Sequence, residues 1–104
     1  LIMFGLGGIF ANFLKDVSFR LAPLSERVVG EMIGETKAYT ILRGVRGVKP
    51  YDIESIQNML LRLSRLVTDF PEITEADINP VFAYPAGEGS VALDVKLVVG
   101  GRST

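Results

Sequence analysis

The stretches Asp77-Ile78-Asn79-Pro80 and Ala92-Leu93-Asp94-Val95-Lys96 flank a turn-like sequence, Pro85-Ala86-Gly87-Glu88. We interpret the two stretches as the strands of a β-hairpin. A turn centred in the intervening sequence places Asn79 directly opposite Asp94. Directly opposed residues of an antiparallel pair have Cβ atoms about 4.5–5.5 Å apart. One oxygen atom from each side chain can therefore approach the same small cation.

Two oxygen ligands on a hairpin favour magnesium as that cation. Mg²⁺ takes an octahedron of oxygen atoms and usually combines one or two protein ligands with water and substrate phosphates. The pattern therefore predicts a metal that arrives with a nucleotide. A second interpretation stays open, in which Asn79 only ends a strand before Pro80 and Asp94 is a solvated residue on the outer face of an amphipathic strand.

The same register places Asp77 opposite Lys96. Side chains alternate between the two faces of a strand, so this pair shares a face with Asn79 and Asp94. We interpret Asp77 and Lys96 as a surface ion pair, which contributes under about 1 kcal/mol to stability, and not as a second site.

Two amphipathic helices are predicted upstream of the hairpin. Ser25 is the N-cap of the first, and Gly30 or Gly34 weakens its end. Asp52 caps the second, and Pro71 stops it. The apolar positions, spaced by helical steps, are Val28, Val29, Met32 and Ile33 in the first helix and Ile53, Ile56, Leu60, Leu63, Val67 and Phe70 in the second.

Extended segments are predicted before the first helix. Residues 1–10 are almost wholly apolar, yet too few to span a membrane, which takes about 20 residues. They also lack the basic flank of a signal peptide, so we interpret them as a buried strand cut from a larger protein. Residues 9–14 and 17–22 follow as strands. In the second of these, Arg20 is assigned to a solvated face, and a position facing the site is the alternative.

These elements predict a two-layer α+β fold, in which an antiparallel sheet is covered on one face by helices. A chain of 104 residues can bury one core, so we expect a single domain. The net charge of −1 gives no general attraction to nucleic acid or to anionic membranes. Cysteine is absent, which excludes disulfides and a thiol nucleophile, and with no export signal we expect a cytoplasmic location.

Five segments in order resemble the C-terminal half of the ATP-grasp domain of NDP-forming acyl-CoA synthetases. These are the ADP-forming acetate–CoA ligase relatives of succinyl-CoA synthetase. The likeness covers nearly the whole chain, so residues 1–104 are expected to form one subdomain. The segments are Gly5-Leu6-Gly7-Gly8-Ile9-Phe10, then Leu14-Lys15-Asp16-Val17-Ser18-Phe19-Arg20-Leu21-Ala22-Pro23-Leu24, then Leu42-Arg43-Gly44 with Arg46-Gly47, then Asp77-Ile78-Asn79-Pro80, and Ala92-Leu93-Asp94.

The resemblance implies that Asn79 and Asp94 coordinate the Mg²⁺ of a bound ATP or ADP. It also implies the reaction, in which acyl-CoA, ADP and phosphate are converted reversibly to the free acid, CoA and ATP through an acyl phosphate and a phosphohistidine. The chain contains no histidine, so by itself it is not expected to be catalytic. The implied partners are the rest of the ATP-grasp domain, the CoA-binding and phosphohistidine domains, CoA and a small carboxylic acid. Association of several copies of the chain into a homo-oligomer is a further alternative.

Three further expectations concern single positions and the class of function. The loop that carries Arg43 and Arg46 has two glycines and concentrated positive charge, which suits phosphates of a nucleotide or CoA; an ordinary charged helix connection is the alternative. Asn12 stands where the resemblance leads us to expect Glu, and an amide cannot act as a carboxylate ligand or base. The competing hypothesis is a nonenzymatic α+β interaction or dimerisation module, whose apolar N-terminus marks a partner surface.

Overall fold

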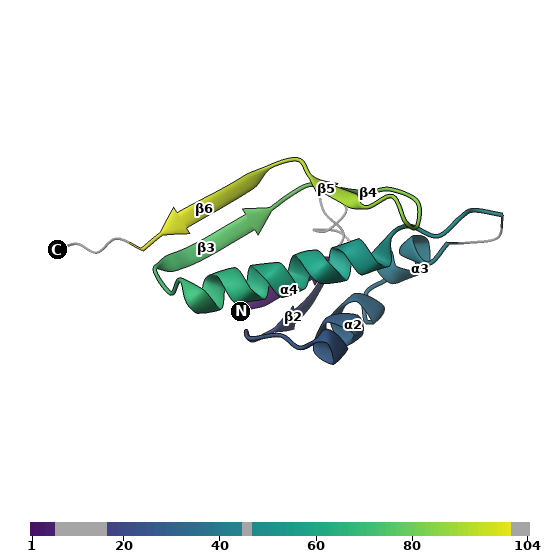
Figure 1. Cartoon of the computed structure of the whole chain (residues 1–104). Helices are drawn as coiled ribbons and strands as arrows, with labels where there is room; N and C mark the ends of the chain where they lie inside the picture. Colours follow the sequence, from purple (N-terminus) through teal and green to yellow (C-terminus); the bar gives the residue numbers. More distant parts are fainter. Residues whose placement is uncertain (6–16, 45–46, 101–104) are drawn as a thin grey trace.

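The computed structural model describes residues 1–5, 17–44 and 47–100 (Figure 1). Three predictions lie outside these ranges: the strand over residues 9–14, the role of Asn12 and that of Arg46. In chain order the elements are β1 (Ile2–Gly5), β2 (Val17–Arg20), α2 (Glu26–Gly34), α3 (Ala38–Leu42), α4 (Ile53–Asp69), β3 (Ile73–Ile78), β4 (Val81–Ala83), β5 (Ser90–Ala92) and β6 (Val95–Val99).

The described strands form antiparallel pairs, β1 with β2, β3 with β6, and β4 with β5. Figure 1 shows the last two pairs as one long ribbon, with α4 running beside β3 and with α2 packed on the far side of α4. The α+β class with antiparallel strands and helices on one side is confirmed. The strands of the described residues are grouped in three separate pairs, where we had expected one sheet.

The hairpin has the register that the sequence predicts. Asp77 lies opposite Lys96 in β3 and β6, and Val81 lies opposite Ala92 in β4 and β5. Between these two pairs, the N–H of Asn79 donates a hydrogen bond to the backbone oxygen of Asp94 at 3.1 Å. The ribbon therefore keeps one register through the predicted site.

Both predicted helices form, and both begin at the predicted caps. The hydroxyl of Ser25 accepts a hydrogen bond from the N–H of Val28 at 3.2 Å, and the carboxylate of Asp52 accepts one from the N–H of Ser55 at 3.0 Å. These bonds satisfy backbone donors that the first turn of a helix leaves unpaired. The predicted stop at Pro71 is also confirmed, because α4 ends at Asp69.

The core lies between the two helices and β1. Its buried residues are Ile2, Val29, Met32, Ile33, Ile56 and Leu60. Ile2 is the buried member of β1, whereas its neighbour Met3 is exposed. Within the described residues this strand therefore buries one face only, and its complete burial in a larger protein stays a prediction. None of the helices in the described ranges has the length and apolar character needed to cross a bilayer.

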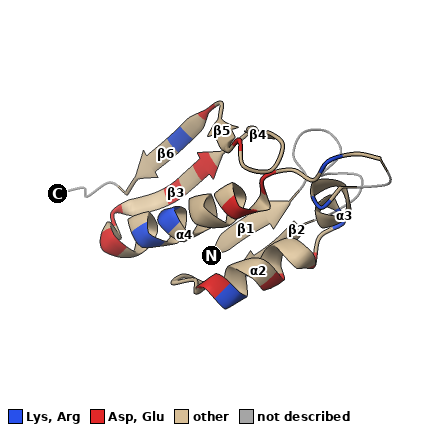
Figure 2. Cartoon of the chain, turned by 45° about the vertical axis from the view of Figure 1, so that its right-hand side comes forward, with Lys and Arg blue, Asp and Glu red and all other residues tan. Residues whose placement is uncertain are grey.

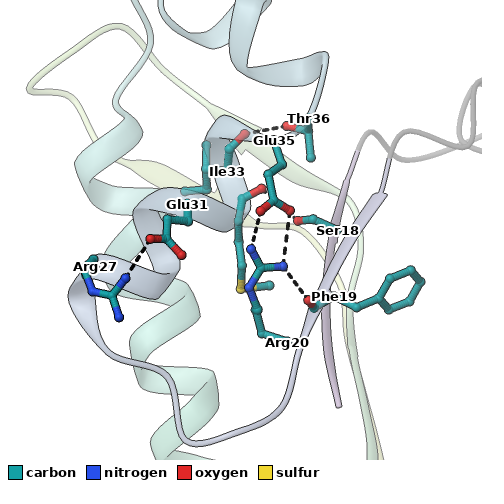
Figure 3. Close-up of polar contacts among 9 residues, drawn as sticks. Ser18, Phe19, Arg20, Arg27, Glu31, Ile33, Glu35 and Thr36 are labelled. Carbon is teal, nitrogen blue, oxygen red and sulfur yellow. Dashed lines mark hydrogen bonds and ion pairs between the residues drawn. The ribbon is translucent and has the colours of Figure 1, made fainter.

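Strand β2 presents the opposite face to the core from the one that its pattern suggests. Ser18 is 5% exposed, whereas Phe19 is 47% exposed and Leu21 is 75% exposed. Figure 3 shows Ser18 and Arg20 pointing toward α2 and the ring of Phe19 pointing away from it. The hydroxyl of Ser18 donates a hydrogen bond to the backbone oxygen of Met32 at 2.8 Å, which satisfies it in this buried position.

We had expected Arg20 to lie on a solvated strand face, and this expectation is wrong. Its guanidinium forms an ion pair with Glu35, just beyond the end of α2 (Figure 3). This hydrogen-bonded contact holds the pKa of Glu35 below its ordinary value. The pair joins β2 to the helix layer.

Helix α3 was not predicted. It spans five residues, Ala38–Leu42, of which Ala38 is buried. A helix of this length shows too few turns for an apolar period to stand out in the sequence. It positions the connection to α4, because the backbone oxygen of Leu42 accepts a hydrogen bond from the N–H of Tyr51 at 2.8 Å.

Candidate metal site

Asn79 and Asp94 lie where the β3–β6 part of the ribbon passes into the β4–β5 part. Asn79 immediately follows β3, and Asp94 immediately precedes β6. Their backbones are joined by the bond from Asn79 to Asp94, and the next pair is joined by a 2.9 Å bond from the N–H of Leu93 to the oxygen of Pro80. Two backbone bonds thus hold the two candidate ligands opposite each other.

The side chains of Asn79 and Asp94 are both exposed. Because the residues are direct partners, their side chains project from the same face of the ribbon. One amide oxygen and one carboxylate are ligands that Mg²⁺ accepts. The described residues hold no group of three or more His, Cys, Asp or Glu that could bind a metal ion. The two residues therefore fit a magnesium ion that brings most of its oxygen ligands with it, as phosphates and water.

Asp77 and Lys96 are direct partners in the register, and both are exposed. No ion pair joins them among the described residues, whereas Arg20, Arg27 and Arg65 each form one. The predicted ion pair between Asp77 and Lys96 is therefore wrong, although the register that suggested it is right. An exposed pair of opposite charges gains little stability by forming an ion pair, because the entropy lost in ordering two long side chains offsets their electrostatic attraction in water.

Arg43 is the cap residue at the end of α3. Its guanidinium carbon lies 5.7 Å from the centre of the Tyr39 ring, a cation–π contact within one helix. The hydrogen bonds and ion pairs found among the described residues do not join Arg43 to Asn79 or Asp94. Its role toward phosphates stays a prediction, and Arg46 lies outside the described residues. Figure 2 shows positive charge around α3 and negative charge at several points along the ribbon.

Sequence reasoning identified Asp52 only as a helix cap and missed its second role. The carboxylate also accepts hydrogen bonds from the N–H groups of Gly89 at 2.7 Å and Gly87 at 3.1 Å. The bonds from Gly89 and Ser55, the largest effects, hold the pKa of Asp52 below its ordinary value. We call this arrangement the Asp52 lock.

The Asp52 lock ties the tip of the ribbon to the start of α4. Gly87 and Gly89 have φ of 88° and 86°, a conformation that side chains other than that of glycine rarely adopt. This backbone conformation directs the N–H groups of both glycines toward the carboxylate of Asp52. Two more bonds cross the same contact, a 2.8 Å bond from the N–H of Asp52 to the oxygen of Tyr84 and a 2.8 Å bond between the hydroxyls of Ser55 and Ser90. The glycines at 87 and 89 indicate a turn at the ribbon tip, but no pattern in the sequence connects them to Asp52, which lies 35 and 37 positions away.

A family model of the ATP-grasp domain matches residues 1–99. The chain belongs to the ATP-grasp domain family. The match covers both strands of the candidate site and both predicted helices, so the family assignment and the observed fold concern the same residues.

Relatives of this ATP-grasp chain include ADP-forming acetate–CoA ligases. The chain is 54% identical to the beta subunit of ADP-forming acetate–CoA ligase II of Pyrococcus furiosus over 101 residues, which cover 96% of the chain and 43% of the relative. It is 51% identical to ADP-forming acetate–CoA ligase I of Archaeoglobus fulgidus, covering 96% of the chain and 14% of the relative. The chain thus spans less than half the length of these relatives.

Solved structures agree with the fold of this ATP-grasp chain. A crystal structure of a Pyrococcus horikoshii protein matches with a TM-score of 0.90 and 50% identity, over 96% of this chain and 42% of that one. The dinucleotide-forming acetyl-CoA synthetase 1 of Ca. Korarchaeum cryptofilum, solved in complex with coenzyme A and Mg-AMPPCP, matches with a TM-score of 0.85 and 48% identity, over 93% and 45%.

Proposed function

We propose that residues 1–104 form one subdomain, the C-terminal part of the ATP-grasp domain of an ADP-forming acyl-CoA synthetase, and that it binds magnesium and a nucleotide. The observation that carries the proposal is the direct opposition of Asn79 and Asp94 on an exposed ribbon face of an ATP-grasp chain. The relative solved with Mg-AMPPCP supports this assignment.

In this proposal the amide oxygen of Asn79 and the carboxylate of Asp94 would hold the ion, and the nucleotide phosphates and water would supply its remaining oxygen ligands. When bound, the magnesium ion would neutralise part of the negative charge on the nucleotide phosphates. The chain positions the two ligands. The register of the ribbon places Asn79 opposite Asp94, and the Asp52 lock holds the ribbon against α4. Arg43 and Arg46 are proposed as further contacts for phosphate groups.

The complete reaction would join acyl-CoA, ADP and phosphate to give the acid, CoA and ATP. The chain has no histidine, so the phosphohistidine, the CoA site and the acid site belong to other segments or subunits in this proposal. The isolated chain is then an inactive part of the enzyme. Its partners are the rest of the ATP-grasp domain and the CoA-binding and phosphohistidine domains.

The test uses an ATP-grasp chimera, in which this chain replaces the 101 matching residues of the Pyrococcus furiosus beta subunit. Calorimetry measures Mg-ADP binding to the chimera and to two variants. Asp94→Asn should weaken binding about tenfold or more, equivalent to at least about 1.4 kcal/mol. Glu75→Gln is the matched control. Like Asp94→Asn, it removes one exposed carboxylate, but Glu75 lies in β3 away from the candidate ligands, so binding should be unchanged.

Equal binding by Asp94→Asn and the parent would remove Asp94 from the metal site. A folded chimera that binds no Mg-ADP, together with dimerisation of the chain through its apolar strand face, would instead support the nonenzymatic interaction module. Urea unfolding of each variant checks that any loss of binding does not arise from loss of fold.

A further inference from the structure

Lys96 is the one cation of the ribbon, which comprises residues 73–99 and is described throughout. Figure 2 shows the basic segment of β6 beside the acidic segments of the ribbon. Lys96 is exposed, and among the described residues it forms no ion pair with its direct partner Asp77. The carboxylates of the ribbon are those of Glu75, Asp77, Glu88 and Asp94. A single positive charge in this acidic ribbon is therefore left without an explanation in the fold.

Lys96 shares a ribbon face with the two candidate metal ligands. Asp94 and Lys96 are two positions apart, so their side chains project from the same face, about 7 Å apart along the strand. Asn79 is the direct partner of Asp94, and Asp77 is the direct partner of Lys96. The face thus carries two neighbouring pairs, an amide with a carboxylate and a carboxylate with an ammonium group.

The charges of these two pairs determine which ions the face attracts. Two carboxylates and one ammonium group leave one net negative charge, which favours a cation. With a magnesium ion bound, the same face carries one net positive charge, which favours the oxygens of a phosphate. Without Lys96 the loaded face would be neutral. The ammonium group therefore decides whether the loaded site attracts an anion.

The side chain of Lys96 has the reach and the donors to contact a phosphate at the metal. Lysine carries a compact charge with three N–H donors on a flexible stem of four carbons. Oxygen ligands lie about 2.0–2.1 Å from a magnesium ion. A phosphate held by the ion therefore stays close to the ribbon face, within range of a long stem that starts about 7 Å along the same strand.

We propose that Lys96 is a phosphate-binding residue, whose ammonium group donates hydrogen bonds to a phosphoryl group held by magnesium at Asn79 and Asp94. The chemistry that it recognises is a phosphate oxygen, supplied by the nucleotide or by inorganic phosphate. The phosphoryl group accordingly lies on the Asp77–Lys96 side of the ion. The inference rests on the proposed function, because it takes Asn79 and Asp94 as the metal ligands.

A purely structural role for Lys96 makes a different prediction. Among the described residues β6 pairs with β3 alone, so its other edge is free. A lysine on an edge strand opposes pairing of that edge with another chain. This role needs a positive charge but no ligand. Loss of Lys96 would then increase self-association and leave phosphate binding unchanged.

The experiment compares Lys96→Gln, Lys96→Arg and Arg62→Gln in the ATP-grasp chimera by calorimetry with magnesium present. Lys96→Gln should weaken nucleotide binding about tenfold or more, as expected for loss of a hydrogen bond between charged groups. Lys96→Arg keeps a charged donor and should restore most of the binding. Arg62 is an exposed cation on α4, so Arg62→Gln is the matched charge change and should stay within about twofold of the parent.

Three probes identify the phosphoryl group that Lys96 contacts. The probes are Mg-ADP, Mg-AMPPCP and inorganic phosphate with magnesium. Equal losses for both nucleotides would place the contact on a phosphate that ADP already contains. A loss for Mg-AMPPCP alone would place it on the terminal phosphate, and a loss for inorganic phosphate alone would place it on free phosphate.

Two further measurements exclude indirect effects. Urea unfolding of Lys96→Gln should match the parent, because the side chain is exposed. Sedimentation should show the same oligomeric state for both. These controls separate loss of a ligand contact from loss of fold and from pairing of the β6 edge.

Three results would overturn the proposal. Equal binding of all three probes by Lys96→Gln and the parent would show no phosphate contact, and increased self-association of that variant would assign Lys96 to protection of the strand edge. Equal losses on Lys96→Gln and Arg62→Gln would show a general effect of net charge. A loss on Lys96→Arg as large as that on Lys96→Gln would show that the positive charge is not what binds.

The metal site is tested separately by Asp94→Asn in the same chimera. Equal binding by Asp94→Asn and the parent would remove Asp94 from the metal site and leave the result for Lys96 standing as a phosphate contact. A loss on Asp94→Asn without any loss on Lys96→Gln would keep the metal site and overturn the role of Lys96. The two proposals can therefore fail independently.

Discussion

The carboxylate of Asp52 accepts a hydrogen bond from the N–H of Gly89 at 2.7 Å, across 37 positions of the sequence. The same carboxylate caps the first turn of α4 through Ser55. One side chain thus joins a helix start to the tip of the ribbon whose other part carries Asn79 and Asp94. The orientation of the candidate site relative to the helix layer depends on this joint.

The Asp52 lock predicts a pH dependence of stability. Because the pKa of Asp52 is lowered in the folded chain, its contribution is fully present above the ordinary value of 3.8 and is lost as the pH falls through the folded pKa. Asp52→Asn should therefore lower the urea midpoint at neutral pH, and its difference from the parent should shrink below that value. Urea unfolding at a series of pH values measures this.

Glu88→Gln is the control for this titration. Glu88 is an exposed carboxylate in the same ribbon tip, so its removal should leave the pH profile of the parent nearly unchanged. An Asp52→Asn variant that keeps the full acid sensitivity of the parent would show that other carboxylates cause the loss of stability at low pH.

Two glycines of the loop after α3 should respond differently to alanine. Gly44 and Gly47 have φ of 88° and 77°, so either substitution costs about 1–2 kcal/mol of backbone strain. A Cβ at Gly44 would also lie 2.7 Å from the backbone oxygen of Val48, whereas a Cβ at Gly47 meets nothing within 4 Å. Gly44→Ala should therefore destabilise the chain more than Gly47→Ala in urea unfolding, and equal effects would contradict this packing.

The isolated chain should bind Mg²⁺ weakly or not at all in the absence of nucleotide. Asn79 and Asp94 supply two protein oxygens, and a partly filled octahedron competes poorly with full hydration of the ion. Calorimetry with magnesium alone should show no saturable heat at millimolar concentrations. Tight, stoichiometric binding would mean that the chain supplies more ligands than these two.

The features that the sequence predicted correctly are those with local signals. The register that brings Asn79 opposite Asp94 follows from a turn between two short strands, and both helices follow from caps and helical spacing. The Asp52 lock escaped prediction because its partners are 37 residues apart. Helix α3 escaped because five residues show no clear period.

The orientation of β2 was not predictable for a different physical reason. Alternation along a strand separates two faces but does not say which one meets the helices. The apolar face with Phe19 is directed away from α2, and the polar face packs on it because Ser18 and Arg20 each find a partner there. An exposed apolar face of this kind is typical of a surface that contacts another molecule or another part of a protein.

This orientation yields the last prediction, made for the isolated chain. Ser18→Ala removes a buried hydrogen bond to Met32 and should cost about 1 kcal/mol in urea unfolding. Phe19→Ala removes a half-exposed ring whose directly opposed residue in β1 is Met3, and it should cost under about 1 kcal/mol. Leu21→Ala, at 75% exposure, should stay within about 0.5 kcal/mol of the parent. A loss of about 3–5 kcal/mol on Phe19→Ala, as for a buried aromatic ring, would instead place the apolar face of β2 in the core.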